Sequence, residues 1–317
     1  MLTCMEYAPL AISGLGTALP QTCLSNQALI EKYGLDSSDE WIQTRTGIQQ
    51  RYICTGDESL ITLATTAVTN ALDAADVAAN KVDALLVATC TAQQHFPSVA
   101  AEVARQLDIS PMVLDVNAAC SGFIYGLQVA QGLQATGAAQ TIVLVGAEAF
   151  SPLLDWTDRS TCVLFGDGAG AVVLQPAKDA GQGLLAVQTG AQPNGTEALK
   201  AAPQVTMQGQ EVFKAAVTRM GQPDAALLAK AGVTLSEIDW VIPHQANSRI
   251  LHAAARMAGI PQEKVINTVG THANTSAASI PLAWHQAQTM GQIQPGELLY
   301  LQAFGAGFTW GEAVIKF

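Results

Sequence analysis

The order of apolar segments in this chain occurs twice, which restricts its fold more than any other feature. "KVDALLVATC" (81–90) and "EIDWVIPHQA" (237–246) each place an aspartate before a short apolar run, and the two aspartates, Asp83 and Asp239, are 156 positions apart. The apolar runs "TIVLVGAEAF" (141–150) and "ELLYLQAFGA" (297–306) repeat at the same offset. A repeat of this kind predicts two similar halves that bury their apolar faces against each other.

Each half alternates strands with helices, which is typical of the α/β class. The strands are continuous apolar runs, and such strands lie in sheets that are covered on both faces. Each half ends in a glycine-rich turn and a strand, "FGDGAGAVVL" (165–174) and "GFTWGEAVIK" (307–316). The sequence therefore predicts an α/β layered sandwich of helices and sheets, built from pseudo-symmetric halves at 1–176 and 177–317.

Composition indicates either an unusually large buried fraction or a membrane protein. Charged residues make up 13% of the chain and apolar residues 49%, whereas about 25% of residues are charged in ordinary globular proteins. The segment 116–147 has no formal charge, but glutamines interrupt it and Gly137 divides it. Because a spanning helix needs about 20 continuous apolar residues, we expect two buried elements here and no membrane span.

Charge and cysteine usage narrow the functional classes. The net charge of −11 argues against a nucleic-acid-binding surface, although an acidic partner can still dock on a local basic patch. No secretory signal is visible before the first basic residue, Lys32. The six cysteines show no CxxC motif or paired spacing, so we expect reduced thiols in a cytoplasmic protein; they are Cys4, Cys23, Cys54, Cys90, Cys120 and Cys162.

Cys120 lies in "VLDVNAACSGFIYGLQ" (113–128), where an apolar strand gives way to a helical pattern. Unpaired backbone N–H groups at a helix N-terminus lower the pKa of a thiol, so this position suits a nucleophile. On residue type alone, the alternative is a buried and inert cysteine.

The repeat brings an asparagine and a histidine toward Cys120. Asn274 follows Cys120 by 154 positions, so the two occupy equivalent loops. His244 follows the apolar run "WVIP" and therefore lies at the carboxyl end of a strand, where catalytic groups gather in α/β sheets. Helix capping is the alternative for Asn274. Of the other histidines, His252 and His285 fall in helical patterns, and His272 is close enough in sequence to support Asn274.

Six segments in order resemble the β-ketoacyl-acyl-carrier-protein synthase III family, condensing enzymes of the thiolase superfamily. They are "DEWIQTRTGI" (39–48), "AACSGF" (118–123), "FGDGAGA" (165–171), "PHQAN" (243–247), "NTSAASIP" (274–281) and "AFGAGFTWG" (303–311). The resemblance covers nearly the whole chain. It implies a thiolase-like αβαβα sandwich with Cys120, His244 and Asn274 as the catalytic triad, and an oxyanion hole formed by the amides of Cys120 and Ala306.

The implied reaction condenses an acyl-coenzyme A primer with malonyl-acyl carrier protein, which initiates fatty acid biosynthesis. It uses no metal and no cofactor besides these substrates. By the same resemblance, Trp41 and Arg159 stack on the adenine of coenzyme A, Asn247 binds its pantetheine arm, and Phe96 reaches into the acyl tunnel of the partner subunit in a homodimer. Without the resemblance, Trp41 and Phe96 read as packing residues.

Basic residues form a stripe after "HQAN". Arg249, His252 and Arg256 share one helical face in a chain that has only 15 lysines and arginines. The functional interpretation is docking of the acidic acyl carrier protein, with Lys214 as a further contact, and the alternative is an ordinary solvated face.

Two departures from the family pattern bear on these expectations. Ala306 stands where the family often has a glycine, and alanine tolerates positive φ poorly. The segment 192–206, near the mouth of the implied substrate tunnel, is shorter than the family suggests. Two alternative functions stay open: a related condensing enzyme of secondary metabolism with the same triad, and a non-catalytic subunit. "FGDGAGA" does not fit a nucleotide-binding GxGxxG motif, so we expect a tight structural turn there.

Overall fold

The computed structural model describes residues 8–179 and 181–317. Its first sheet has five strands in the order β1 (Leu10–Ala18), β7 (Gly168–Pro176), β6 (Ile142–Glu148), β4 (Ala84–Ala88) and β5 (Met112–Val116). β4 runs parallel to β5 and β6, whereas β7 is antiparallel to both of its neighbours. β5 is an edge strand.

The second sheet repeats this order. Its strands are β8 (Gly183–Gly195), β13 (Gly307–Lys316), β12 (Leu298–Gly305) and β11 (Trp240–Pro243), with the same parallel and antiparallel pairings. A parallel bridge between Val241 and Val265 occupies the place that β5 has in the first sheet. The two sheets are therefore built on one strand plan, as the sequence repeat predicts.

The two aspartates of the repeat, Asp83 and Asp239, form equivalent hydrogen bonds in the two halves. The carboxylate of Asp83 accepts from the backbone N–H of Thr141, just before β6, and that of Asp239 accepts from the N–H of Leu298, which begins β12. Each aspartate also donates its own N–H to a carbonyl at the same neighbouring strand. The carboxylates thus fix the register of the parallel strand pair in each half.

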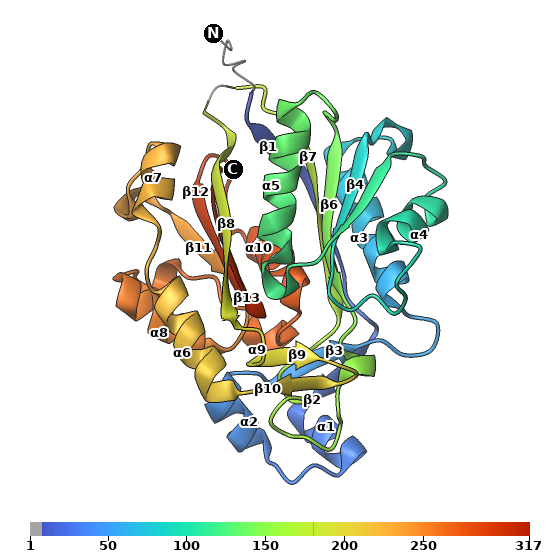
Figure 1. The fold of residues 1–317 in the computed structure, drawn as a ribbon, viewed down its shortest axis with the longest axis vertical. Helices are drawn as coiled ribbons and strands as arrows, with labels where there is room; N and C mark the ends of the chain where they lie inside the picture. The colour runs from blue at the N-terminus through green and yellow to red at the C-terminus, as the bar shows by residue number, and fades with distance from the viewer. Residues whose placement is uncertain (1–7, 180) are drawn as a thin grey trace.

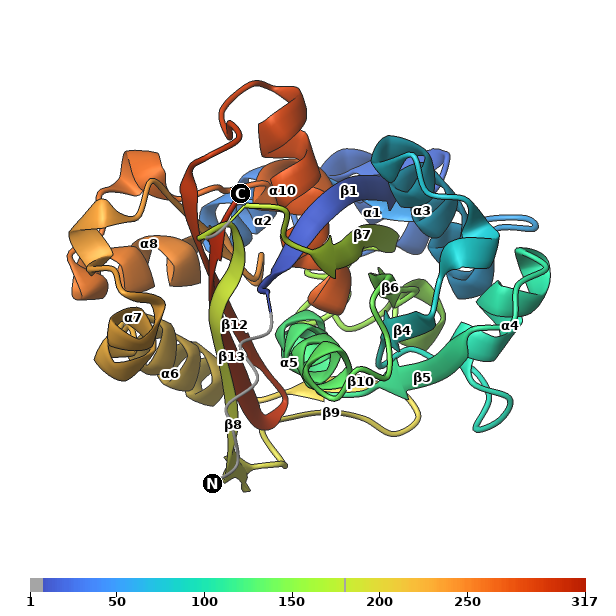
Figure 2. The same ribbon diagram turned by 90° about the horizontal axis from the view of Figure 1, so that it is seen from above.

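Two helices form the middle layer between the sheets, α5 (Gly122–Ala135) and α10 (Ser279–Thr289) (Figure 2). The largest apolar core joins their buried side chains to both sheets, and it includes Leu86, Leu144, Phe123, Ile280, Trp284, Leu299 and Leu301. This core contains residues of both halves. The domain boundary between residues 176 and 177 therefore stays a prediction.

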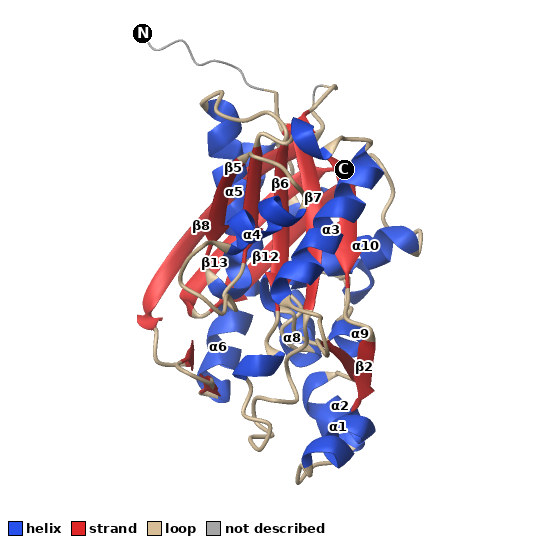
Figure 3. Cartoon of the chain, turned by 90° about the vertical axis from the view of Figure 1, so that its right-hand side faces the viewer, coloured by secondary structure: helices blue, strands red, loops and turns tan. Residues whose placement is uncertain are grey.

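The outer faces of the sheets are also covered by helices. α3 (Leu60–Ala75) and α4 (Val99–Gln106) pack on the first sheet (Figure 3), and α7 (Ala225–Ala231) and α8 (Ser248–Ala258) pack on the second. α6 (Gly209–Met220) lies against α8. The layers therefore alternate helix, sheet, helix, sheet, helix, and the predicted α/β sandwich is confirmed.

Shorter elements gather at one end of the sandwich (Figure 1). They are β2 (Thr22–Ser25), α1 (Asn26–Tyr33), α2 (Asp39–Thr46), β3 (Gln50–Ile53), β9 (Leu199–Ala201), β10 (Val205–Met207) and α9 (Val269–His272). The uncharged segment 116–147 forms α5 and β6, two buried elements as predicted. Among the described helices, none has the length and apolarity that crossing a bilayer requires.

Candidate active site

Cys120 lies in a single 3₁₀ turn, Ala119–Ser121, between the end of β5 and the first residue of α5. The turn is tight, since Ala119 has a φ of 47°. It is held from the second half, where the hydroxyl of Thr309 donates to the carbonyl of Ala118. Gly305 presses on the same turn, because a Cβ at that position would lie 2.7 Å from the backbone N of Cys120.

The electrostatics of Cys120 differ from the sequence expectation. Burial raises the pKa of its thiol to about 12 and Glu148 adds to that increase, while a hydrogen bond from Ser276 and the backbone N–H of Cys120 act in the opposite direction. The N–H group favours the thiolate as expected, but desolvation outweighs it. The pKa of the Cys120 thiol is therefore raised, in contrast to the lowered pKa that the sequence predicts.

His244 follows β11 directly and is buried. Burial lowers the pKa of its imidazole to about 4, against a smaller opposite effect from the backbone of Ser276. The ring is therefore neutral at neutral pH, and its Nδ1 has no hydrogen-bond partner among the described residues. A neutral imidazole with a free nitrogen can form a hydrogen bond with a bound ligand, as donor or as acceptor according to its tautomer.

Asn274 is fixed by the glycine-rich segment of the first half. Its N–H donates to the carbonyl of Leu164, and its carbonyl accepts from the N–H of Gly166. The side-chain oxygen accepts from the N–H of Ser276 at 2.9 Å, which leaves Nδ2 as the donor for a ligand. The segment "FGDGAGA" (165–171) is structural, as predicted, but residues 168–171 already belong to β7, so it begins a strand and is not a tight turn. Phe165 and Gly166, just before that strand, orient Asn274.

Cys120, His244 and Asn274 line one cavity, together with Asn247, Phe213 and Phe304. A second cavity also reaches Cys120, and it is lined by Cys90, Phe150, Leu199, Val205 and Ala306. The structure thus brings the three predicted residues together, at a point where two cavities meet. Leu199 and Val205 belong to the short segment 192–206, which forms one wall of the second cavity.

Backbone geometry explains why an alanine is tolerated at position 306. It is absent from the residues with positive φ, whereas the following Gly307 has a φ of 128°. The neighbouring Gly305 has no room for a Cβ. The chain therefore keeps glycine at the two positions that need it, and Ala306, which lines a cavity together with Cys120, does not need a positive φ.

Trp41 and Arg159 come together on the surface. The guanidinium carbon of Arg159 lies 5.1 Å from the centroid of the Trp41 ring, and that of Arg45 lies 5.8 Å from it. Arg159 also pairs with Asp36. A planar ligand that stacks on Trp41 would therefore do so beside two guanidinium groups.

Phe96 is 85% exposed, so core packing, its alternative reading, is contradicted. Met112 and Leu114 on the edge strand β5 are also exposed. An unpaired strand edge with apolar side chains is a ready site for pairing with another chain.

The basic stripe lies on the exposed face of α8: Arg249, His252 and Arg256 all point to solvent. The Arg249 guanidinium carbon is 5.5 Å from the ring centroid of Phe213, a residue of the Cys120 cavity. Lys214, the next residue on α6, is exposed as well. Asn247 both caps α8, accepting from the N–H of Arg249 at 2.8 Å, and lines the cavity.

Apart from Cys90, the remaining histidines and cysteines of the described residues do not line the two cavities that reach Cys120. Burial lowers the pKa of His272 to about 4, and its ring packs near Tyr52. His285 shares a hydrogen bond with the hydroxyl of Thr17. Five cysteines are free thiols, namely Cys23, Cys54, Cys90, Cys120 and Cys162, and Cys4 lies outside the described residues.

Sequence reasoning missed three residues around the nucleophile, namely Cys90, Glu148 and Ser276. Ser276 has a φ of 48° and is buried, and its hydroxyl lies 3.7 Å from the Sγ of Cys90. Glu148 is a lone acid in the apolar run "TIVLVGAE", a signal that was available in the sequence.

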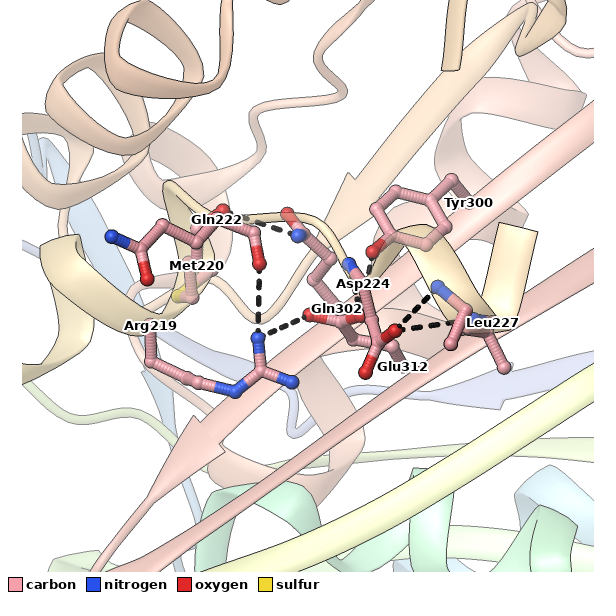
Figure 4. A network of polar contacts seen from close by, with 9 residues as sticks. Arg219, Met220, Gln222, Asp224, Leu227, Tyr300, Gln302 and Glu312 are labelled. Atoms are coloured by element: carbon pink, nitrogen blue, oxygen red, sulfur yellow. Dashed lines mark hydrogen bonds and ion pairs between the residues drawn. The ribbon is translucent and has the colours of Figure 1, made fainter. Parts of the chain in front are cut away.

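A buried ion pair anchors α6, which forms one wall of the cavity. Arg219 donates to the Glu312 carboxylate at 2.8 Å, and Tyr300 donates to the same carboxylate at 2.7 Å (Figure 4). The Arg219 guanidinium carbon also lies 3.8 Å from the ring centroid of Trp310. The C-terminal end of α6 is thereby tied to β13 and β12.

Family models match both halves of the chain. One described as 3-oxoacyl-acyl-carrier-protein synthase III covers residues 114–193, and one described as the C-terminal part of that synthase covers residues 228–317.

Individual proteins agree with these models. A β-ketoacyl-acyl-carrier-protein synthase III of Rhizorhabdus wittichii is 46% identical over 316 residues, which span 96% of this chain and 98% of that protein. The crystal structure of 3-oxoacyl-acyl-carrier-protein synthase III from Aquifex aeolicus superposes with a TM-score of 0.93 at 43% identity, covering 97% and 100% of the two chains. The priming β-ketosynthase of the R1128 polyketide pathway reaches a TM-score of 0.91 at 30% identity, covering 98% of this chain and 96% of that one. With its thiolase-like fold and matches along its whole length, the chain belongs to the β-ketoacyl-acyl-carrier-protein synthase III family.

Proposed function

We propose that this protein is an acyltransferase that condenses an acyl-coenzyme A primer with malonyl-acyl carrier protein to give 3-oxoacyl-acyl carrier protein. The observation that carries the proposal is the convergence of Cys120, His244 and Asn274 on one cavity in a chain of this family. The higher identity to the fatty-acid synthases than to the polyketide priming enzyme favours initiation of fatty acid biosynthesis. A protein with these substrates acts in the cytoplasm.

In the first half-reaction, the Cys120 sulfur attacks the thioester carbonyl of the primer and coenzyme A leaves as its thiolate. The oxyanion formed on the carbonyl is stabilised by the N–H groups of Cys120 and Ala306. The close approach of Gly305 to Cys120 supports this role, because it brings the two backbone segments together.

In the second half-reaction, malonyl-acyl carrier protein enters and loses carbon dioxide. The enolate that forms on its thioester is stabilised by hydrogen bonds from His244 and from Nδ2 of Asn274. The carbanion then attacks the acyl group on Cys120. The lowered pKa of His244 supports this assignment, since a neutral imidazole donates without adding a buried charge. No step requires a metal or an additional cofactor.

The two half-reactions can be tested separately. Cys120→Ala loses acyl transfer but still decarboxylates malonyl-acyl carrier protein, because that step forms no bond to sulfur. His244→Ala and Asn274→Ala each still accept an acyl group on Cys120, and each loses about 100- to 1,000-fold in decarboxylation rate. Release of labelled carbon dioxide is measured beside the intact mass of the acyl-enzyme. A His244→Ala enzyme that decarboxylates normally but fails to acylate would assign His244 to deprotonation of the thiol instead.

The basic stripe is the proposed docking site of the acyl carrier protein. Arg249 lies on Phe213 at the cavity that holds Cys120, so a carrier bound there has its phosphopantetheine arm at the entrance. Arg256 on the same helix and Lys214 on the adjacent helix extend the positive surface on an acidic protein.

Charge reversal tests this surface. Arg249→Glu raises KM for malonyl-acyl carrier protein, and Arg256→Glu does so less because it lies further from the cavity. The KM of the wild type also rises with ionic strength, since salt screens exposed charges. Lys230→Glu makes the same charge change on exposed α7 and serves as the control. If Arg249→Glu and Lys230→Glu give equal KM values, the stripe is only a solvated face.

A homodimer is the proposed assembly. β5 is an edge strand of the first sheet and carries the exposed Met112 and Leu114, and Phe96 is exposed in the loop that follows β4. A second copy bound at this edge would cover these side chains. In such a dimer, Phe96 would contribute to the acyl tunnel of the partner.

A further inference from the structure

Asn274 lies in a strained part of the chain. Ala273 before it has a φ of 58°, Ser276 after it has a φ of 48°, and both residues are buried. Residues other than glycine adopt such angles at a cost in free energy, and they keep them only where the surrounding structure holds them. The turn at Ser276 matters for the site, because its N–H donates to the side-chain oxygen of Asn274 at 2.9 Å. Whatever holds this turn therefore also holds the side chain of Asn274.

The end of β6 contacts this turn at Ala277, the residue after Ser276. A Cβ at Gly146 would lie 2.3 Å from the carbonyl oxygen of Ala277, so the strand and the turn meet directly. Glu148 lies two positions further along β6 and therefore faces the same side of the sheet. Its carboxylate accepts from the N–H of Ala277 at 3.5 Å. The turn, which belongs to the second half of the chain, thus rests on a strand of the first half.

Glu148 is itself fixed by the loop that follows β4. The hydroxyls of Thr91 and Thr89 donate to its carboxylate at 2.7 and 3.1 Å, and the N–H of Cys90 reaches both oxygens, at 3.1 and 3.3 Å. The thiol of Cys90 donates to the same carboxylate at 3.3 Å, and its sulfur lies 3.7 Å from the hydroxyl of Ser276. The carboxylate therefore joins the loop of Cys90 to the turn of Ser276.

The surroundings of Glu148 require a carboxylate. The side chain has no exposed surface, and no lysine or arginine among residues 8–179 and 181–317 forms an ion pair with it. A buried acid of this kind is costly unless hydrogen bonds satisfy it, and the groups that bond to it are donors, which suit an ionised carboxylate. Because the N–H of Cys90 reaches both oxygens, a glutamine would place its NH2 group against that N–H in either orientation.

We propose that Glu148 is a positioning residue for Asn274, and that it acts by holding the strained turn at Ser276 and Ala277 against β6. The turn fixes the side-chain oxygen of Asn274 and so directs Nδ2 toward the thioester of malonyl-acyl carrier protein. Glu148 lines neither cavity at Cys120, so its effect passes through the turn. The inference rests on the function proposed above, in which Asn274 stabilises the enolate.

Decarboxylation of malonyl-acyl carrier protein tests this role, because Asn274 acts in that step. Glu148→Gln is expected to lower the decarboxylation rate by about tenfold or more, since a displacement near 1 Å costs up to about 100-fold. The decisive measurement is a double-mutant cycle, which reports whether two residues act through each other. In the Asn274→Ala enzyme, the further change Glu148→Gln should cost less than about twofold, because the group that Glu148 positions is gone.

Glu312→Gln is the matched control, since it removes another buried carboxylate that bonds to Arg219 and Tyr300 and not to the Ser276 turn. Its effect on the decarboxylation rate should be the same factor with Asn274 present and with Asn274 replaced by alanine. A loss that is merely structural would behave like this control, whereas a loss that passes through Asn274 disappears with it.

Thr91→Val keeps the proposal falsifiable if Glu148→Gln does not fold. It removes the shortest bond to the carboxylate and leaves the charge in place, and its smaller loss in rate should also disappear in the Asn274→Ala enzyme. A wild-type rate in the variant that folds, or an equal loss with and without Asn274, would overturn the positioning role. A wild-type enzyme that does not decarboxylate malonyl-acyl carrier protein would overturn the proposed function instead, so the two failures are distinct.

Discussion

Single atoms decide the position of the nucleophile. Gly305 lies against the backbone N of Cys120, although the two residues come from different halves of the chain. The absence of one methyl group there allows β12 to approach the turn that holds the thiol. Ala306, one residue further on, does not have a positive φ, so its methyl group adds no backbone strain. Within this loop, glycine is therefore required at positions 305 and 307 but not at position 306.

Gly305→Ala should displace Cys120, because the added Cβ would meet backbone and not the end of a flexible side chain. We expect acyl transfer to fall by about 100-fold or more, the loss that a misplacement near 1 Å produces. The rate of acyl-enzyme formation by intact mass measures it. Gly132→Ala is the control, since a Cβ in that exposed turn of α5 meets nothing within 4 Å. Equal rates in the two variants would show that the approach of Gly305 has no catalytic consequence.

At the scale of elements, α6 is held in its place at the Cys120 cavity by polar groups at its C-terminal end. α6 supplies Phe213, Ala216 and Met220 to the cavity wall, and its end is tied to the second sheet by Arg219 and Glu312 (Figure 4). Burial raises the pKa of Glu312, while Arg219 and Tyr300 act against that increase. Removing the Glu312 charge would leave the partly buried Arg219 guanidinium without its counter-ion.

Glu312→Gln is expected to lower the free energy of unfolding by about 3 kcal/mol, the cost of breaking a buried ion pair. Chemical denaturation monitored by circular dichroism measures the change. The exposed pair of Lys200 and Glu197 provides the control. Glu197→Gln should change stability by less than about 1 kcal/mol, and a similar loss in both variants would contradict the special role of the buried pair.

Three of the exposed large apolar side chains of the described residues lie on or near the edge of the first sheet. Met112 and Leu114 on β5 are exposed, and Phe96 lies before α4 in the loop that follows β4. The rest of that sheet is covered by helices on both faces. This uncovered edge is the surface that the homodimer proposed above would cover.

Leu114→Lys places a charge on this edge and should shift the protein from dimer to monomer. Sedimentation velocity measures the change. Met290→Lys, at an exposed methionine after α10, makes a similar change elsewhere and should leave the assembly as it is. A wild type that sediments as a monomer, or a Leu114→Lys variant that remains dimeric, would exclude β5 as the interface.

The sequence determined the repeat, the α/β class and the three residues Cys120, His244 and Asn274, because each depends on local pattern. Apolar runs mark buried strands, and equivalent loops of two similar halves must meet. The raised pKa of Cys120, and the contacts of Cys90 with Glu148 and Ser276 close to it, were decided by the tertiary structure alone. Local pattern shows that a thiol lies before a helix, which favours the thiolate. Desolvation and the approach of a distant carboxylate depend on every layer packed around the site, and only the assembled fold brings them to bear on that sulfur.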